Sequence, residues 1–84
     1  MQENLLRRVE PVYPPEARLA RIQRRVIVEA EISKAGTVDN LMLISGHPLL
    51  VQAALEAARQ WRYRPVLVNG EPVAVLTTIT IIFQ

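Results

Sequence analysis

The chain has 84 residues, of which half are apolar and none is cysteine, and its formal net charge is +2 at pH 7. This length fits one domain with a modest core, and the lack of cysteine excludes a disulfide framework, a zinc ribbon and thiol chemistry. The best candidate for a membrane span, Val73 to Phe83, falls short of the roughly 18 residues that a membrane helix needs. Aromatic residues are too scarce for base stacking, so no nucleic-acid partner is expected.

The first part of the chain reads as an approach to a domain. Residues 1–10 show no periodicity, and we expect them to form a flexible lead-in to a domain spanning residues 11–84. Prolines keep this approach extended, because a residue before proline is disfavoured in the α region.

A short helix is predicted over residues 16–21. Pro15 suits the first turn of this helix, where the missing N–H of proline costs nothing. Ala17 and Ala20 are expected to face the body of the domain, and Tyr13 is expected to lie nearby as an anchor.

Two strands follow as a hairpin. Residues 25–33 alternate between apolar and polar, which is typical of a strand with one buried face. Gly36 lies in the turn because glycine tolerates positive φ, and residues 37–45 form the second strand. The alternation of this second strand breaks at Asn40 and Leu41, which predicts a bulge. The buried face of the first strand is expected to consist of Val26, Val28, Ala30 and Ile32.

A helix of about 12 residues is predicted from Pro48, because apolar residues recur at intervals of three and four up to Trp61. Pro65 forbids its continuation, and Asn69-Gly70 predicts a reversal. The last strand is expected over residues 72–83. Its more apolar face is expected to carry Val73, Val75, Thr77, Ile79, Ile81 and Phe83.

The predicted order is therefore helix, strand, strand, helix, strand. This order predicts an α+β fold in which two helices pack on one face of a three-stranded antiparallel sheet.

Several motifs in this order together resemble the TonB carboxy-terminal domain family, from about residue 10 to the end. The ordered set is specific, although each piece is common. The motifs are Val12-Tyr13-Pro14, Ala17, Gly36-Thr37-Val38, Ser45-Gly46-His47-Pro48-Leu49-Leu50, Ala53-Ala54-Leu55, Trp61-Arg62-Tyr63-Arg64-Pro65 and Asn69-Gly70-Glu71-Pro72-Val73. The chain departs from the family at Gln23-Arg24-Arg25, where a glycine usually enters the first strand. We expect Arg24 to avoid positive φ there.

The resemblance implies a role as well as a fold. It implies the periplasmic domain of an inner-membrane-anchored energy transducer, which couples the ExbB and ExbD motor proteins to outer-membrane transporters by gripping their TonB box. ExbB and ExbD would be reached through an amino-terminal region outside this sequence. The start of the chain lacks the features of a signal peptide, so we expect a domain excised from a longer protein.

Strand addition is the physical route by which such a domain could grip a peptide, because an exposed edge offers unpaired backbone groups. The expected edge is the last strand, and the peptide-binding residues expected there are Val75, Leu76, Thr77, Thr78, Ile79 and Thr80. The alternative is a strand that is core on one side and solvated on the other. Tyr13 and Pro14 would either line the groove for the peptide or hold the first helix to the sheet.

The same edge also predicts self-association. No charge follows Glu71, so little blunts the last strand, and a homodimer through it is expected. Two other functions remain open: a self-associating assembly module, and a peptidoglycan-binding periplasmic domain. The peptidoglycan alternative would use the arginines at positions 18, 21, 24 and 25, which otherwise form a solvated face.

No enzymatic activity, cofactor or metal site is expected. His47 is the only histidine, and it lies in a Gly-His-Pro turn where it suits a helix start. A triad of Ser45, His47 and Asp39 would need an orienting group in reach, and Asp39 lies far back on the same strand. No glycine-rich phosphate loop and no spacing of metal ligands is present.

Overall fold

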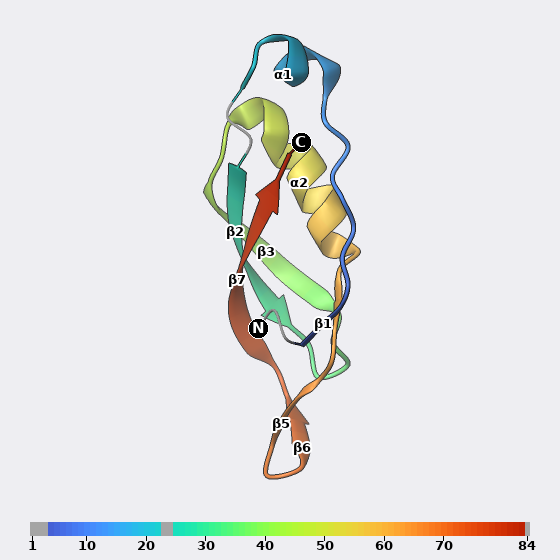
Figure 1. Cartoon of the computed structure of the whole chain (residues 1–84). Coiled ribbons are helices and arrows are strands. Elements are labelled where there is room, and N and C mark those ends of the chain that lie inside the picture. The colour runs from blue at the N-terminus through green and yellow to red at the C-terminus, as the bar shows by residue number, and fades with distance from the viewer. Residues whose placement is uncertain (1–3, 23–24, 84) are drawn as a thin grey trace.

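A computed structural model describes residues 4–22 and 25–83 of the chain. Its elements follow one another around a single elongated body (Figure 1). In chain order they are β1 (Leu5–Arg7), α1 (Pro15–Leu19), β2 (Arg25–Ile32), β3 (Val38–Ser45), α2 (Pro48–Arg59), β4 (Arg62–Tyr63), β5 (Val66–Val68), β6 (Glu71–Val73) and β7 (Val75–Ile82).

The centre of the molecule is a three-stranded antiparallel sheet in the order β3-β2-β7. Helix α2 lies across one face of this sheet, whereas α1 lies at one end of the body (Figure 1). The α+β class with two helices and antiparallel pairing is therefore confirmed, and the difference is that α1 packs at the end of α2 instead of beside it. The core between sheet and helix includes Val26, Val28, Ala30, Ile32, Leu50, Ala54, Ala58, Ile79, Ile81 and Phe83.

The alternation of β2 is confirmed, because its four expected core residues are fully buried. In α1 the expectation is half right. Ala17 is buried, but Ala20 is exposed because the helix ends at Leu19 and Ala20 is its carboxy-terminal cap. The expected conformation of Arg24 lies outside the described residues.

Strand β3 is irregular where the sequence predicted a bulge. Its register against β2 shifts between Glu29 and Glu31, opposite Asn40 and Leu41, and shifts again between Ile27 and Val28. Asn40 has a φ of 46°, and its Nδ2 donates to Glu31 Oε1 at 2.6 Å. The extra residues bend this edge of the sheet away from regular pairing.

Helix α2 begins as predicted. Pro48 occupies its first turn, and His47 Nδ1 accepts a hydrogen bond from Leu49 N at 3.1 Å. The histidine is thus the amino-terminal cap, satisfying a backbone donor that the helix leaves free. Trp61 lies just after the helix and is buried, as expected.

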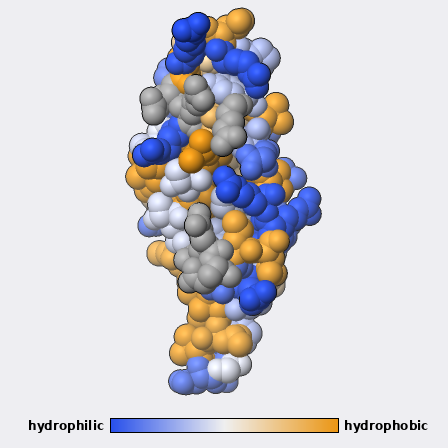
Figure 2. Space-filling model, in the orientation of Figure 1, coloured by the Kyte–Doolittle hydropathy of each residue, from blue (hydrophilic) through white to orange (hydrophobic). Residues whose placement is uncertain are grey.

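Two features escaped the sequence patterns. Strand β1 lies within the expected lead-in and pairs with β4. The last strand is not continuous, because β6 pairs with β5 in a hairpin while β7 pairs with β2. The reversal at Asn69-Gly70 is confirmed, with φ values of 52° and 83°. The β5–β6 hairpin projects as an arm (Figure 1), and Figure 2 shows apolar surface on it. Leu67 and Val68 of β5 are exposed.

Candidate functional site: a regular sheet edge at β7

Strand β7 offers the regular edge of the central sheet. It pairs with β2 through eight successive residues, from Ile32↔Val75 to Arg25↔Ile82, without a register shift. In the part of the chain that the structure describes, no strand pairs with its other side. The opposite edge, β3, carries two irregularities, so the two edges differ in how well they could template an added strand.

The six residues expected to bind a peptide in the last strand all lie within β7. Their side chains divide between the two faces of the sheet. Leu76, Thr78 and Thr80 are exposed on the face away from α2, and the relative solvent exposure of Leu76 is 69%. Ile79 is buried in the core, whereas Val75 and Thr77 are half-buried. An added strand would therefore meet the backbone at all six positions but side chains mainly on the outer face.

Tyr13 lies beside the end of β7 and not along its middle. Its ring meets the Phe83 ring edge-on, with centroids 5.5 Å apart, and its hydroxyl donates to Ile22 O at 3.3 Å. The Arg18 guanidinium lies 5.0 Å from the Tyr13 ring centre. These contacts hold the segment before α1 to the segment after it and to the core. Pro14 is the amino-terminal cap residue of α1, and its carbonyl accepts from Arg18 N at 3.0 Å.

The extended segment before Tyr13 is tied to the core by a contact that the sequence did not reveal. Trp61 Nε1 donates to Val9 O at 3.0 Å, and the Arg8 guanidinium lies 5.7 Å from the Trp61 ring centre. A buried tryptophan normally needs a partner for its N–H, so a partner could be expected from the sequence. Its identity could not, because 52 residues separate the two groups.

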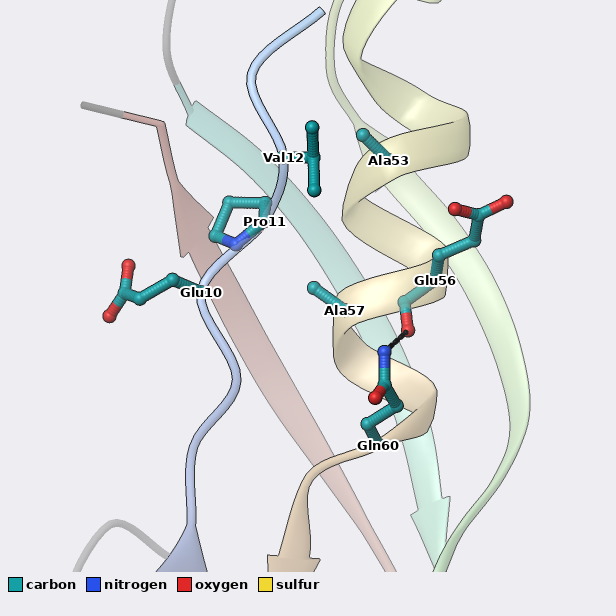
Figure 3. Close-up of a pocket in the computed structure, with 7 residues that line it drawn as sticks. All are labelled: Glu10, Pro11, Val12, Ala53, Glu56, Ala57 and Gln60. Atoms are coloured by element: carbon teal, nitrogen blue, oxygen red, sulfur yellow. Dashed lines mark hydrogen bonds between the residues drawn. The ribbon is translucent and has the colours of Figure 1, made fainter.

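A shallow groove separates this extended segment from α2 (Figure 3). Its volume is about 70 Å³, far below the several hundred Å³ of typical small-molecule sites. The side chains of Glu10 and Glu56 point away from each other, and the floor is formed by alanines (Figure 3). This groove therefore offers no converging polar groups for a small ligand.

The residues considered for catalysis are used structurally. His47 caps α2, and Asp39 Oδ1 accepts from the Thr37 hydroxyl at 3.3 Å. Among residues 4–22 and 25–83, no group of three metal-ligating side chains is present, and no helix there is long and apolar enough to cross a membrane.

Burial raises the pKa of the Tyr63 hydroxyl above its usual value of about 10. The folded state therefore favours the neutral phenol, and this contribution is present below about pH 10 and lost as the pH rises through the folded-state pKa. We expect urea unfolding between about pH 8 and pH 11 to show a steeper loss of stability in the original chain than in Tyr63→Phe. Equal slopes would contradict this.

The fold and this edge define a small α+β domain with a regular sheet edge that no described strand covers. The family described as the Gram-negative bacterial TonB protein C-terminal matches residues 9–84, so the chain belongs to this family. The family is one of energy transducers, not of enzymes, and in TonB proteins this domain is periplasmic.

Similar proteins agree with this assignment. Protein TonB of Klebsiella pneumoniae is 35% identical over 79 residues, which cover 92% of this chain and 30% of that protein. Protein TonB of Vibrio cholerae is 37% identical over 78 residues, covering 90% of this chain and 32% of that protein. The solution NMR structure of the Pseudomonas aeruginosa TonB CTD superposes with a TM-score of 0.75 at 29% identity, covering 95% of this chain and 83% of that one. The chain thus spans about a third of the length of the Klebsiella pneumoniae and Vibrio cholerae proteins.

Proposed function

We propose that this chain is the periplasmic protein-binding domain of a TonB-type energy transducer and that it grips the TonB box of an outer-membrane transporter by strand addition to β7. An inner-membrane anchor and contacts with ExbB and ExbD would belong to the rest of such a protein. The observation that carries the proposal is the unbroken eight-residue register of β7 beside an unpaired edge.

Strand addition suits a link that bears force. An extended peptide on β7 would satisfy the outward backbone N–H and C=O groups of that strand. A row of such hydrogen bonds that is loaded all at once along the strand resists a pulling force better than the same bonds broken one at a time. Because the backbone supplies the affinity, the site would accept several peptide sequences, with Leu76, Thr78 and Thr80 setting preference on the outer face.

N-methylated peptides test this mode of binding. In an added strand, alternate amides of the peptide donate to β7 while the others point to solvent. We therefore expect calorimetric titration with a TonB-box-like peptide to lose measurable binding when one set of alternate amides is methylated. Methylation of the other set should change little. Equal effects of both sets would contradict strand addition.

Tyr13 provides a second test, which concerns the extent of the peptide site. Because its contacts with Ile22 and Phe83 are structural, we expect Tyr13→Phe to keep the ring contact and to bind the peptide as the original chain does. A Tyr13→Ala variant that folds normally but no longer binds would extend the peptide site to Tyr13 and Pro14.

Self-association through β7 is a second candidate function. The outer sheet face exposes Leu76, Ile82 and Met42, so a second copy at this edge would also find apolar surface. Sedimentation velocity over a wide concentration range should show a dimer that the TonB-box-like peptide dissociates. A monomer at every concentration would remove this candidate, and a dimer unaffected by peptide would favour the assembly module.

A further inference from the structure

Three arginines gather on the outward face of the short β1–β4 ladder. Arg7 pairs with Arg62 in this antiparallel ladder, after a register shift between Leu5 and Arg7, and paired residues share one face of a ladder. Arg64 follows two residues later, and its N–H donates to Asn4 O at 2.6 Å, so pairing continues past Tyr63. Because Tyr63 is buried between them, Arg62 and Arg64 both face outward, and all three arginines are exposed.

No side chain in the described part of the chain compensates the charge on this face. Like charges directly opposite each other on neighbouring strands repel. Among the described residues, the only ion pair joins Arg8 to Glu10 at 3.6 Å, so no described carboxylate forms an ion pair with the three arginines. Arg59 adds another cation in the last turn of α2. The ladder therefore attracts an anionic group that residues 4–22 and 25–83 do not supply.

Hydrogen bonds within the domain also fix the position of the ladder in the absence of a ligand. Arg62 Nη1 donates to Arg59 O at 3.1 Å and to Trp61 O at 2.8 Å, which leaves the other N–H groups of this guanidinium for a partner. On its far side, β4 is joined to the β2–β3 turn, because Tyr63 N donates to Gly36 O at 2.9 Å. Arg7 and Arg62 thus lie on paired strands, and Arg64, which follows β4, is tied to Asn4 by its backbone N–H.

We propose that Arg7, Arg62 and Arg64 form a docking surface for an extended acidic segment of a partner protein, with carboxylates at alternate positions. Residues two apart on a strand project roughly 6.6 Å apart, which is also the spacing of alternate side chains in an extended peptide. Guanidinium groups pair bidentately with carboxylates. A lipid surface carries phosphates but no such fixed spacing, so the strand spacing favours the peptide. The surface lies on a sheet separate from β7 and does not depend on strand addition.

The test is a titration with a capped alanine peptide that carries glutamate at two alternate positions, followed by the backbone amide chemical shifts of the domain. We expect shifts around Arg7 and Arg62 to Arg64 that weaken as salt is raised, because exposed charges are screened. Arg7→Gln and Arg64→Gln should each weaken binding about twofold to fivefold, as for exposed ion pairs. Arg62 is left unchanged because it also caps α2.

The matched control is Arg25→Gln, which removes the same charge from an exposed arginine at the other end of β2 and should leave binding unchanged. If Arg25→Gln weakened peptide binding as much as Arg7→Gln and Arg64→Gln do, the net charge of the domain alone would explain the binding, and the proposal would be overturned. Equal binding of a peptide with glutamine in place of glutamate would also overturn it. A third contrary outcome is Arg64-dependent binding to phosphatidylglycerol vesicles without binding of the glutamate peptide, which would assign the surface to a membrane.

Discussion

Substitution of Gly36 by alanine is expected to remove a large share of the stability of the domain. Gly36 has a φ of 87°, and a Cβ added there would overlap the carbonyl oxygen of Tyr63. The turn cannot retreat freely, because Gly36 N donates to Ser33 O and Gly36 O accepts from Tyr63 N, both at 2.9 Å. Strain at positive φ and forced displacement together predict a loss of about 2–6 kcal/mol.

Urea unfolding of Gly36→Ala beside Gly70→Ala separates these causes. Gly70 has nearly the same φ, 83°, but a Cβ added there would meet nothing within 4 Å. Gly70→Ala should therefore show conformational strain alone, about 1–2 kcal/mol. A domain of this length has only about 4–12 kcal/mol to lose, so the difference should be plain in the unfolding midpoints. Equal losses would mean that contact with β4 contributes nothing.

The second large effect is expected from Phe83→Ala. Phe83 is fully buried at the end of β7, and its ring meets Tyr13 edge-on. Truncating a buried phenylalanine typically costs about 3–5 kcal/mol, because apolar contacts are lost and a cavity remains. Thermal and urea unfolding should both report this loss.

Leu76→Ala is the matched control for Phe83→Ala. Leu76 lies in β7, which Phe83 directly follows, but it is 69% exposed, so its truncation should change stability by no more than about 0.5 kcal/mol. If Phe83→Ala lowers stability no more than Leu76→Ala does, the packing of Phe83 against the segment before α1 does not stabilise the end of the sheet. The two variants also separate peptide binding from folding, because the exposed Leu76 can affect peptide preference without affecting folding.

Much of the fold follows from local pattern. The strict alternation of β2 predicts which of its residues are buried, since a strand with one covered face must alternate. The start of α2 follows from Pro48, and the β5–β6 reversal follows from Asn69-Gly70, because each position has a conformational requirement that few residues meet.

The features that the sequence does not reveal depend on strand partners that lie far away along the chain. Strand β1 has three residues and no periodicity, and it exists because β4, more than 50 positions later, pairs with it. The break between β6 and β7 is likewise invisible, because the apolar run continues through Ala74 while the pairing partner changes. For the site, the pattern indicates an exposed last strand and a bulge in β3, but the unbroken register of β7 and the second irregularity of β3 follow only from the pairing.

Amide hydrogen exchange, measured with and without a TonB-box-like peptide, reports on strand addition at β7 residue by residue. We expect the peptide to slow exchange at the alternate amides between Val75 and Thr80 that point away from β2, and to leave exchange along β3 unchanged. Protection along β3, or no change along β7 while the domain is folded and monomeric, would contradict it.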